Sequence, residues 1–346
     1  MGRASYTAFR EDRRRGLLTI GPIVIDGTPL ARRDQEVLLR DFDQEPSDWV
    51  LDREEFRPGT VSLTFRRVWV QPAKKHLVKA HAVALPPKGA TTTIIITSDL
   101  QCPQHDRRFH QAVCAFIKEV QPQGLLDLGD LINFAPLSRF GRNPYWAETV
   151  QGGVDAAYGV WCDRLAAAPG AWAKQIGGNH DYYTQRTILA NADALYGLHQ
   201  AGQVDMVFGL PHLLRLPELG VEWIVDAAGD WPHSRVRLAP KLIATHGWIA
   251  RKGSGKSALA TIEHFGHSAI VGHTHRASQV YHTVHNPDGS HSTHVGIENG
   301  TGATIKGGLG YAVAPDWQNS VSVVRVRSDG TFSANLVLYQ DGKLFA

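Results

Sequence analysis

Five short polar motifs, each following an apolar segment, constrain this chain of 346 residues more than any other feature. The motifs are Ser98-Asp99-Leu100-Gln101, Gly129-Asp130, Gly178-Asn179-His180-Asp181, Thr245-His246-Gly247 and Gly272-His273-Thr274-His275. Residues 94–96, 125–128, 242–244 and 269–271 lead into four of them and are typical of buried strands. Side chains at the ends of successive buried strands converge in space even when they are far apart in sequence. The pattern therefore predicts an α/β fold with one shared polar site.

The residue types in these motifs are those that hold divalent cations. Carboxylates, amide oxygens and imidazoles are hard or borderline donors. Two cations about 3.5–4 Å apart, bridged by one carboxylate, can clamp the attacking and leaving oxygens of a phosphoryl transfer. Taken alone, Asp130 could be a helix N-cap and Asn179 a turn residue. Five such motifs in one chain favour a two-metal site instead.

In their order, the motifs resemble those of the calcineurin-like metallophosphoesterase family, over residues 92–280. The likeness lies in the series Asp-x-Gln, Gly-Asp, Gly-Asn-His-Asp, His and Gly-His-x-His. The resemblance implies a hydrolase acting on phosphoric ester bonds, with a four-layer α/β/β/α sandwich over residues 90–346. It also implies two divalent metal ions as cofactors. Mn²⁺ is the first expectation, and Mg²⁺, Fe²⁺ and Zn²⁺ are the alternatives.

The resemblance also assigns roles to single residues. The implied metal ligands are Asp99, Gln101, Asp130, Asn179, His246, His273 and His275. Asp99, Gln101 and His275 would hold the first metal, Asp130 would bridge, and the other three would hold the second. The nucleophile would be a metal-bound hydroxide. His180 would stay free of metal and act as general acid on the leaving group, a contribution of about 10²–10⁴-fold.

Two positions depart from the family's pattern. Gln101 stands where the first motif normally has histidine, and its amide oxygen predicts a weaker first site that prefers Mn²⁺ or Mg²⁺ to Zn²⁺. Asn133 stands where a carboxylate would lie behind the catalytic histidine. Asn133 can accept a hydrogen bond from His180 but adds no charge, so the imidazolium is less stabilised. A catalytically weak metal-binding scaffold of the same fold is therefore an alternative.

The substrate is predicted from what the second motif lacks. The protein-phosphatase branch carries an arginine after Gly-Asp-x-x-Asp, whereas residues 129–135 of this chain contain none. A phosphodiesterase is therefore the first choice. It would be either a nuclease acting on DNA or RNA or an enzyme that hydrolyses a cyclic nucleotide. The expected substrate-binding residues are Arg142, Lys256, Ser257 and Arg276. Gln101 and the segment 315–319 resemble phage-encoded and prophage-encoded members of the family.

Residues 250–257 fit a relaxed phosphate-loop pattern ahead of a predicted helix at 256–265, so a P-loop ATPase is a further alternative. Against it, the segment begins four residues after His246, and no second strand ends in an obvious partner carboxylate. We expect its backbone N–H groups and Lys256 to rim the metal cleft and contact a substrate phosphate.

The remaining histidines have a simpler interpretation. The histidines that flank the turn at 286–289 are expected on the solvated face of a hairpin and not in a third metal site; they are His282, His285, His291 and His294. His105 is expected to be an exposed loop residue. Residues 279–284, 292–297, 321–326 and 332–338 alternate like strands and are predicted to complete the second sheet.

Composition excludes a disordered chain, since 43% of the residues are hydrophobic and 20% are charged. The formal charge of +3 is compatible with a phosphate-rich partner but does not establish one. Three cysteines without metal-knuckle spacing suit a reducing compartment, so the cytoplasm is expected. With no signal-peptide pattern and no apolar run of 18 residues, no membrane partner is expected. The oligomeric state is left open.

The break at 85–90 predicts a separate α+β accessory module over residues 1–85. Within it, 34–42 is predicted as a helix, and 60–65 and 68–70 as strands. Its basic side chains could dock nucleic acid. Acidic residues between 41 and 55 largely offset that charge, which favours a small β module with solvated basic side chains.

Overall fold

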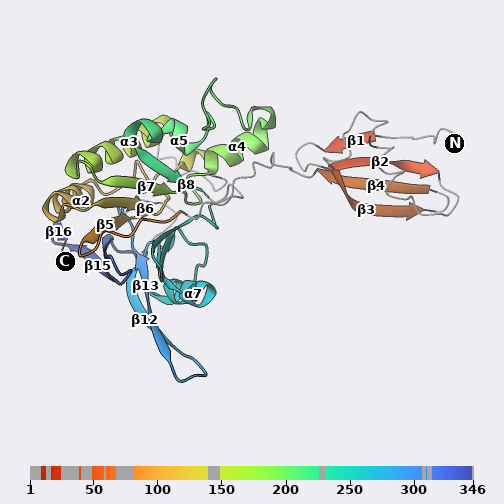
Figure 1. Cartoon of the computed structure of the whole chain (residues 1–346). Coiled ribbons are helices and arrows are strands. Elements are labelled where there is room, and N and C mark those ends of the chain that lie inside the picture. Colours follow the sequence, from red (N-terminus) through yellow and green to blue (C-terminus); the bar gives the residue numbers. More distant parts are fainter. Residues whose placement is uncertain are drawn as a thin grey trace. The chain divides into compact units, whose positions relative to one another are not determined.

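The computed structural model describes residues 9–12, 17–24, 39, 49–57, 60–67, 81–138, 149–225, 231–305, 309 and 314–344. The chain divides into two compact units, residues 1–77 and 78–346 (Figure 1). The break predicted at 85–90 falls within the second unit. The expected helix at 34–42, apart from Leu39, and the expected strand at 68–70 lie outside the described residues.

The first unit contains a four-stranded antiparallel sheet in the order β1-β2-β4-β3. Its strands are β1 (Phe9–Asp12), β2 (Leu17–Val24), β3 (Trp49–Arg57) and β4 (Thr60–Arg67). Alternate residues of β2 and β4 are buried together, namely Leu18, Ile20, Val61, Leu63 and Phe65. This period of two places one face of the sheet against a small core. The strand predicted at 60–65 is confirmed by β4.

The second unit is built on a seven-stranded sheet in the order β16-β15-β14-β5-β6-β7-β8 (Figure 1). Its parallel strands are β5 (Thr91–Thr97), β6 (Gly124–Asp127), β7 (Trp172–Ile176) and β8 (Val221–Ile224). Its antiparallel strands are β14 (Ser320–Arg327), β15 (Phe332–Gln340) and β16 (Lys343–Leu344). Both faces of β5 and β6 are buried, which explains their continuous apolar sequences.

A five-stranded sheet in the order β12-β13-β11-β10-β9 lies against the seven-stranded sheet. Its strands are β9 (Arg235–Ala239), β10 (Leu242–Thr245), β11 (Ser268–Val271), β12 (Ala277–His285) and β13 (His291–Asn299). The four strands predicted beyond residue 278 are all present. Their predicted placement is wrong for β14 and β15, because β14 pairs with β5 and so joins the seven-stranded sheet.

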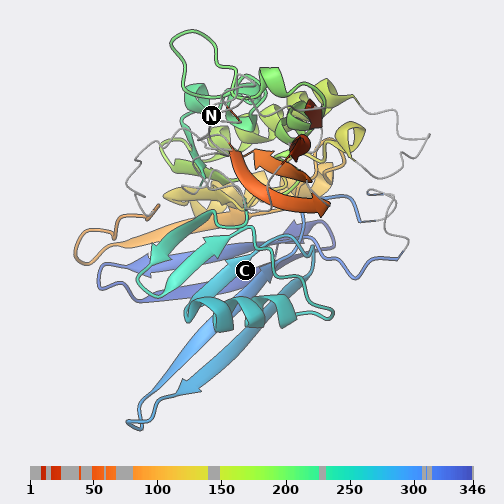
Figure 2. The same ribbon diagram turned by 90° about the vertical axis from the view of Figure 1, so that its right-hand side faces the viewer.

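Helices cover the outer faces of both sheets (Figure 2). The helices are α2 (Arg107–Val120), α3 (Val150–Ala167), α4 (Tyr183–Asn191), α5 (Leu210–Leu213), α6 (Leu216–Leu219) and α7 (Lys256–Phe265), with short 3₁₀ turns at Ala135–Leu137 and Asp193–Leu195. Ile95 of β5 packs in a core with α2 and α3, whereas Ile94 and Ile96 pack in a second core with the other sheet. The α7 helix contacts the five-stranded sheet. The predicted α/β/β/α layering is confirmed.

None of the helices in the described part of the chain combines the length and apolar character that crossing a membrane requires.

Candidate metal centre

The five polar motifs meet where strands of both sheets end. Asp99 follows β5 by two residues, and Asp130 follows β6 by three. Asn179 follows β7 by three residues, His246 directly follows β10, and His273 follows β11 by two. Because β5, β6 and β7 run parallel, as do β10 and β11, their carboxyl ends lie at one edge of each sheet. The fold therefore places donors from two sheets around one site.

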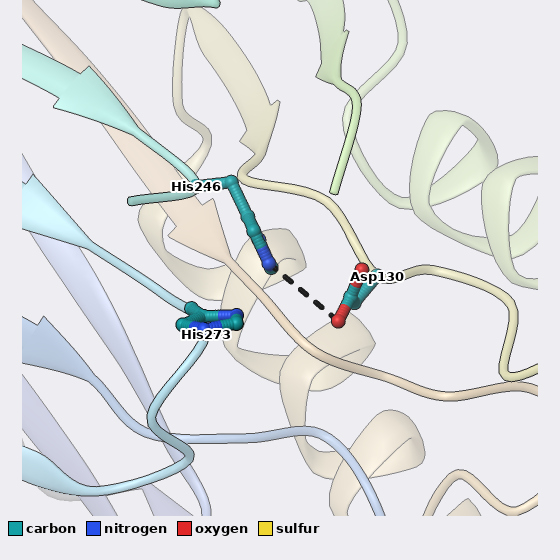
Figure 3. Close-up of side chains that lie close together, drawn as sticks. All are labelled: Asp130, His246 and His273. Atoms are coloured by element: carbon teal, nitrogen blue, oxygen red, sulfur yellow. Dashed lines mark ion pairs between the residues drawn. The ribbon is translucent and has the colours of Figure 1, made fainter. Parts of the chain in front are cut away.

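The centre of this site is formed by Asp130, His246 and His273, whose donor atoms all lie within 4.8 Å of one another. Figure 3 shows the His246 ring directed at the Asp130 carboxylate, with His273 beside them. The Nε2 atom of His246 lies 3.5 Å from Oδ2 of Asp130 and 3.3 Å from Oδ1 of Asn179. Asp130 and His246 are buried, so these groups face each other away from bulk water.

The remaining predicted ligands adjoin this cluster. Nε2 of His275 lies 3.3 Å from Oδ1 of Asp99, and both side chains are buried. Gln101 donates from Nε2 to Oδ2 of Asp130 at 3.2 Å. Its carbonyl oxygen is buried and has no hydrogen-bond partner among the described residues. A buried acceptor without a partner is costly, and a cation would satisfy it.

Backbone strain is concentrated at the predicted ligands. Nine non-glycine residues in the described part of the chain have positive φ. Five of them are predicted ligands, namely Asp99 (φ 52°), Gln101 (55°), Asp130 (52°), His273 (69°) and His275 (61°). Side chains with a Cβ atom rarely adopt this region, and it persists only where the surroundings enforce it. The fold therefore bears a conformational cost at these positions.

Two glycines of the motifs permit close approach to the carboxylates. A Cβ atom at Gly178 would lie 2.2 Å from Oδ1 of Asp130. One at Gly272 would lie 2.6 Å from Oδ2 of Asp99. Any larger residue would displace an acidic side chain, which explains why the third and fifth motifs begin with glycine.

The surroundings favour a positive charge on His246 and oppose one on His273. The Nδ1 atom of His246 donates to the Leu128 carbonyl at 3.1 Å, which directs Nε2 toward Asp130. Burial opposes a charge on His246, but the Asp130 carboxylate outweighs it and raises the pKa of His246 to about 9. Burial also opposes ionisation of Asp130, yet His246 and His180 hold the pKa of that carboxyl well below its usual range. Burial, followed by the charge on His246, lowers the pKa of His273 to about 4.

His180 lies beside this cluster and is partly exposed. Its Nδ1 atom donates to the main-chain carbonyl of Asn133 at 2.8 Å, and its Nε2 atom lies 3.9 Å from Oδ2 of Asp130. The ring stacks on Tyr183 with 4.7 Å between centroids. Asn133 therefore accepts a hydrogen bond from His180 as expected, but through its main-chain carbonyl, and its side-chain amide donates to Gln104. The main-chain carbonyl takes the place of the missing carboxylate.

Two further carboxylates hold the ligand loops and were not predicted as such. Asp181 is buried and accepts main-chain N–H bonds from Asp130 and Gly178, each at 2.8 Å. Asp127 accepts the N–H of Gly129 at 3.0 Å and pairs with the buried Arg164 at 2.9 Å. Both carboxylates therefore position the Gly129-Asp130 turn. In the sequence, Asp181 is recognised only as the last residue of the third motif, without a role of its own.

The predicted substrate-binding residues have other partners. Arg142 lies outside the described residues. Ser257 is buried, accepts the N–H of Arg251 through its hydroxyl, and donates its own N–H to Glu298 at 2.9 Å. Arg276 contacts the same carboxylate at 3.4 Å and the Arg251 carbonyl at 2.6 Å. Both groups hold the loop at 251–257, and their substrate-binding roles stay predictions. Lys256 is exposed at the start of α7.

Two tryptophans missed by the sequence reasoning adjoin the histidines. The Trp231 ring centroid lies 5.6 Å from that of His246 and 5.7 Å from that of His273. Trp317 lies 4.5 Å from His275. Only the segment 315–319, noted for its family resemblance, hinted at Trp317. No sequence pattern indicated Trp231.

The other histidines lie elsewhere. β12 and β13 form the expected hairpin, in which His285 pairs with His291 across the ladder and both are exposed. His294 is buried and bonds Ser292, so its predicted solvation is wrong. His105 is partly buried beside α2 and is not the exposed loop residue expected from sequence.

Two curated phage proteins share sequence with the chain. The Gene 54 protein of Mycobacterium phage D29 is 29% identical over 197 residues, which cover 55% of this chain and 71% of that protein. The Gene 54 protein of Mycobacterium phage L5 is 27% identical over 200 residues, which cover 55% of this chain and 72% of that protein. No family model matches the chain.

Several solved structures are similar at a distance. Vacuolar protein sorting 29 from Cryptosporidium parvum has a TM-score of 0.37 and 12% identity, covering 74% of this chain and 95% of its own. YfcE, a phosphoesterase from E. coli, has a TM-score of 0.30 and 16% identity, and the match covers 70% of this chain and 98% of YfcE. Vps29 from Chaetomium thermophilum has a TM-score of 0.28 and 13% identity, and the match covers 71% of this chain and 94% of that protein. At these scores, activity has to be argued from the chain itself.

Proposed function

We propose that the chain is a binuclear, metal-dependent phosphoesterase of the calcineurin-like type, and that its substrates are phosphodiesters. The observation that carries this proposal is the cluster of Asp130, His246 and the partly exposed His273, with Asp99 and His275 adjoining it. Carboxylate and imidazole donors lie close together there, and both are ligands that a pair of divalent cations can use.

The donor set fits two cations. Asp99, Gln101 and His275 would hold one, the Asp130 carboxylate would be shared, and the remaining ligands, Asn179, His246 and His273, would hold the other. The unpartnered oxygen of Gln101 supports a ligand role for this residue and a preference for Mn²⁺ or Mg²⁺. When bound, the cations would supply Lewis-acid polarisation of the phosphoryl oxygens and activation of a water molecule.

His180 would donate a proton to the departing oxygen. Its Nδ1 atom is held by the Asn133 carbonyl and its ring is stacked on Tyr183, so Nε2 faces the cluster in a fixed orientation. The proton to be transferred would be the one on Nε2. A general acid positioned in this way typically contributes about 10²–10⁴-fold to the rate.

A preference for diesters is inferred from the second motif. The segment 129–135 carries no arginine to neutralise a phosphomonoester dianion. Arg276, next to His275, is engaged with Glu298. A diester carries a single negative charge and has less need of such a group.

The ATPase alternative has little support. In a phosphate loop, the N–H groups at the start of the helix point at phosphate. Here the N–H groups of Ser257 and Ala258 donate to the buried Glu298 carboxylate, at 2.9 and 3.4 Å. A phosphate at this position would meet a negative charge.

One experiment separates the candidates. Purified protein is incubated with bis(p-nitrophenyl) phosphate, p-nitrophenyl phosphate and ATP, each with Mn²⁺, with Mg²⁺ and with chelator. The proposal predicts metal-dependent turnover with the diester preferred over the monoester. Metal binding without turnover would indicate a scaffold. ATP hydrolysis abolished by Lys256→Ala would indicate a phosphate loop.

A further inference from the structure

A strongly basic surface segment adjoins the metal centre. Residues 231–265 contain six Lys or Arg residues and a single acidic residue, Glu263, which is a formal charge of +5, whereas the whole chain carries +3. Arg251, Lys252 and Lys256 are exposed, and none of them forms an ion pair with a described residue. Three of the six cations in this segment therefore lie within six residues, at 251–256.

These three cations are carried by a loop fixed next to the ligand residues. The guanidinium of Arg276, the neighbour of His275, donates to the Arg251 carbonyl at 2.6 Å. Ser257 accepts the Arg251 N–H at 3.0 Å, and Ser254 lies 3.5 Å from the Ala277 carbonyl. The loop between β10 and α7 is thus tied to the segment that follows His275. The backbone that carries these cations is therefore fixed beside the ligand segment before any ligand binds.

An aromatic ring also adjoins the centre. Trp231 is partly exposed, and its ring is tilted by 32° to that of His273. It leads into β9, whose Arg235 pairs with Thr245, the residue before His246. An indole beside the reacting phosphate offers a surface on which an unpaired base can stack.

We propose that this surface, formed by Trp231, Arg251, Lys252 and Lys256, binds single-stranded nucleic acid. The inference rests on the proposed diesterase function, and it narrows the substrate class. Three cations in one loop suit successive phosphates of a polymer, whereas a cyclic nucleotide carries only one phosphate. Stacking on Trp231 requires an unpaired base, which a duplex withholds. Cationic side chains and aromatic rings together are the usual means of binding single strands.

The test measures binding without turnover. Metal-loaded His180→Ala protein is titrated against a fluorescein-labelled 12-nucleotide DNA strand, its RNA counterpart and the DNA duplex, and anisotropy is read at several salt concentrations. Either single strand should bind more tightly than the duplex, and the two single-strand arms reveal the preferred sugar. Changing Arg251, Lys252 and Lys256 together to Gln should weaken binding at least tenfold. The slope of log Kd against log salt should fall by about 2, because each phosphate that a cation neutralises on a single strand contributes about 0.7 to this slope.

The control is Lys241→Gln, because Lys241 is exposed in the β9–β10 turn, at the end of β10 opposite to the loop that carries the three cations. It should bind like the parent. Trp231→Ala should weaken binding by about 5- to 100-fold, as expected when one base can no longer stack, and Trp231→Phe should restore most of the affinity. Circular dichroism of each variant checks folding, and Lys252→Gln alone is the fallback if the triple variant is unfolded.

An unchanged salt slope in the triple variant, an equal weakening in Lys241→Gln, or tighter binding of the duplex would overturn the inference. Failure of the proposed function is recognised separately, because it would abolish turnover of bis(p-nitrophenyl) phosphate by the unmodified protein and leave the binding measurements readable.

Discussion

Histidines gather in two regions of the second unit, and the two groups differ in almost every physical respect. His246, His273 and His275 follow parallel strands and lie against buried carboxylates, two of them at positive φ. The histidines of the β12–β13 hairpin face one another across an antiparallel ladder, in ordinary strand backbone. Histidine number is similar in the two places. Convergent strand ends and adjacent carboxylates are what distinguish the candidate metal centre.

The charges that act on the histidines differ between the two regions. At the centre, Asp130 raises the pKa of His246 in spite of burial. On the hairpin, burial lowers the pKa of His294, and the positive charges of His267, His282 and Lys241 lower it further. The first region therefore holds carboxylates that can bind a cation, whereas no carboxylate raises the pKa of His294 in the second. Each prediction below tests whether this difference controls metal binding.

The largest effect is expected for Asp130→Asn. Removing the shared carboxylate leaves two cations facing each other with less compensation, so metal content and diesterase activity should both collapse. Mass spectrometry of the bound metal and turnover of bis(p-nitrophenyl) phosphate measure the two quantities. A variant that kept two metals and near-normal turnover would refute the bridging role.

A smaller and more selective effect is expected for His180→Ala. Both metals should remain, while turnover falls by about 10²–10⁴-fold. The decrease should be smaller for a nitrophenyl ester than for a dinucleotide, because nitrophenolate leaves without needing a proton. Equal decreases on the two substrates would remove His180 from the general-acid role.

Gln101→His should strengthen the weaker metal site. An imidazole in place of the amide should tighten that site by about tenfold and extend the usable metals toward zinc. Calorimetric titration with Mn²⁺ and Zn²⁺ measures both affinities. If the weaker affinity stayed constant or fell, Gln101 would not be a ligand.

The smallest effect is expected on the hairpin. Replacing His285 and His291 together by Ala should leave metal content and turnover unchanged, and should alter the free energy of unfolding by less than about 0.5 kcal/mol, since both side chains are exposed. Urea denaturation and metal analysis provide the comparison with Asp130→Asn. Loss of one metal from this variant would show that the two histidine groups were wrongly separated.

Much of the layered fold could be predicted because its signals are local. Apolar segments such as 94–96 have the length and burial of inner strands, and the helix predicted at 256–265 is α7. Which sheet a strand joins is not a local property. Nothing in the alternation of β14 indicates that Ser322 pairs with Ile96, more than two hundred residues earlier.

The candidate site likewise has features that the sequence indicates locally and features that only the folded chain reveals. Side chains that act by their chemical type, such as Asp130 and His246, stand out in short motifs. Contacts made by the main chain leave no such mark, and the Asn133 carbonyl that holds His180 could not be anticipated. Glu298 lies 41 residues from Ser257, and only the folded chain shows that it occupies the start of α7.

The central claim is that two bound cations are required for diester hydrolysis at the cluster around Asp130. The most direct test adds Mn²⁺ stepwise to chelator-treated protein and follows both the metal bound per chain and the turnover of bis(p-nitrophenyl) phosphate. The account predicts that turnover is absent without metal, rises with added Mn²⁺, and reaches its plateau at two bound ions per chain. Full turnover in chelator, or two bound ions with no turnover of any diester, would contradict it.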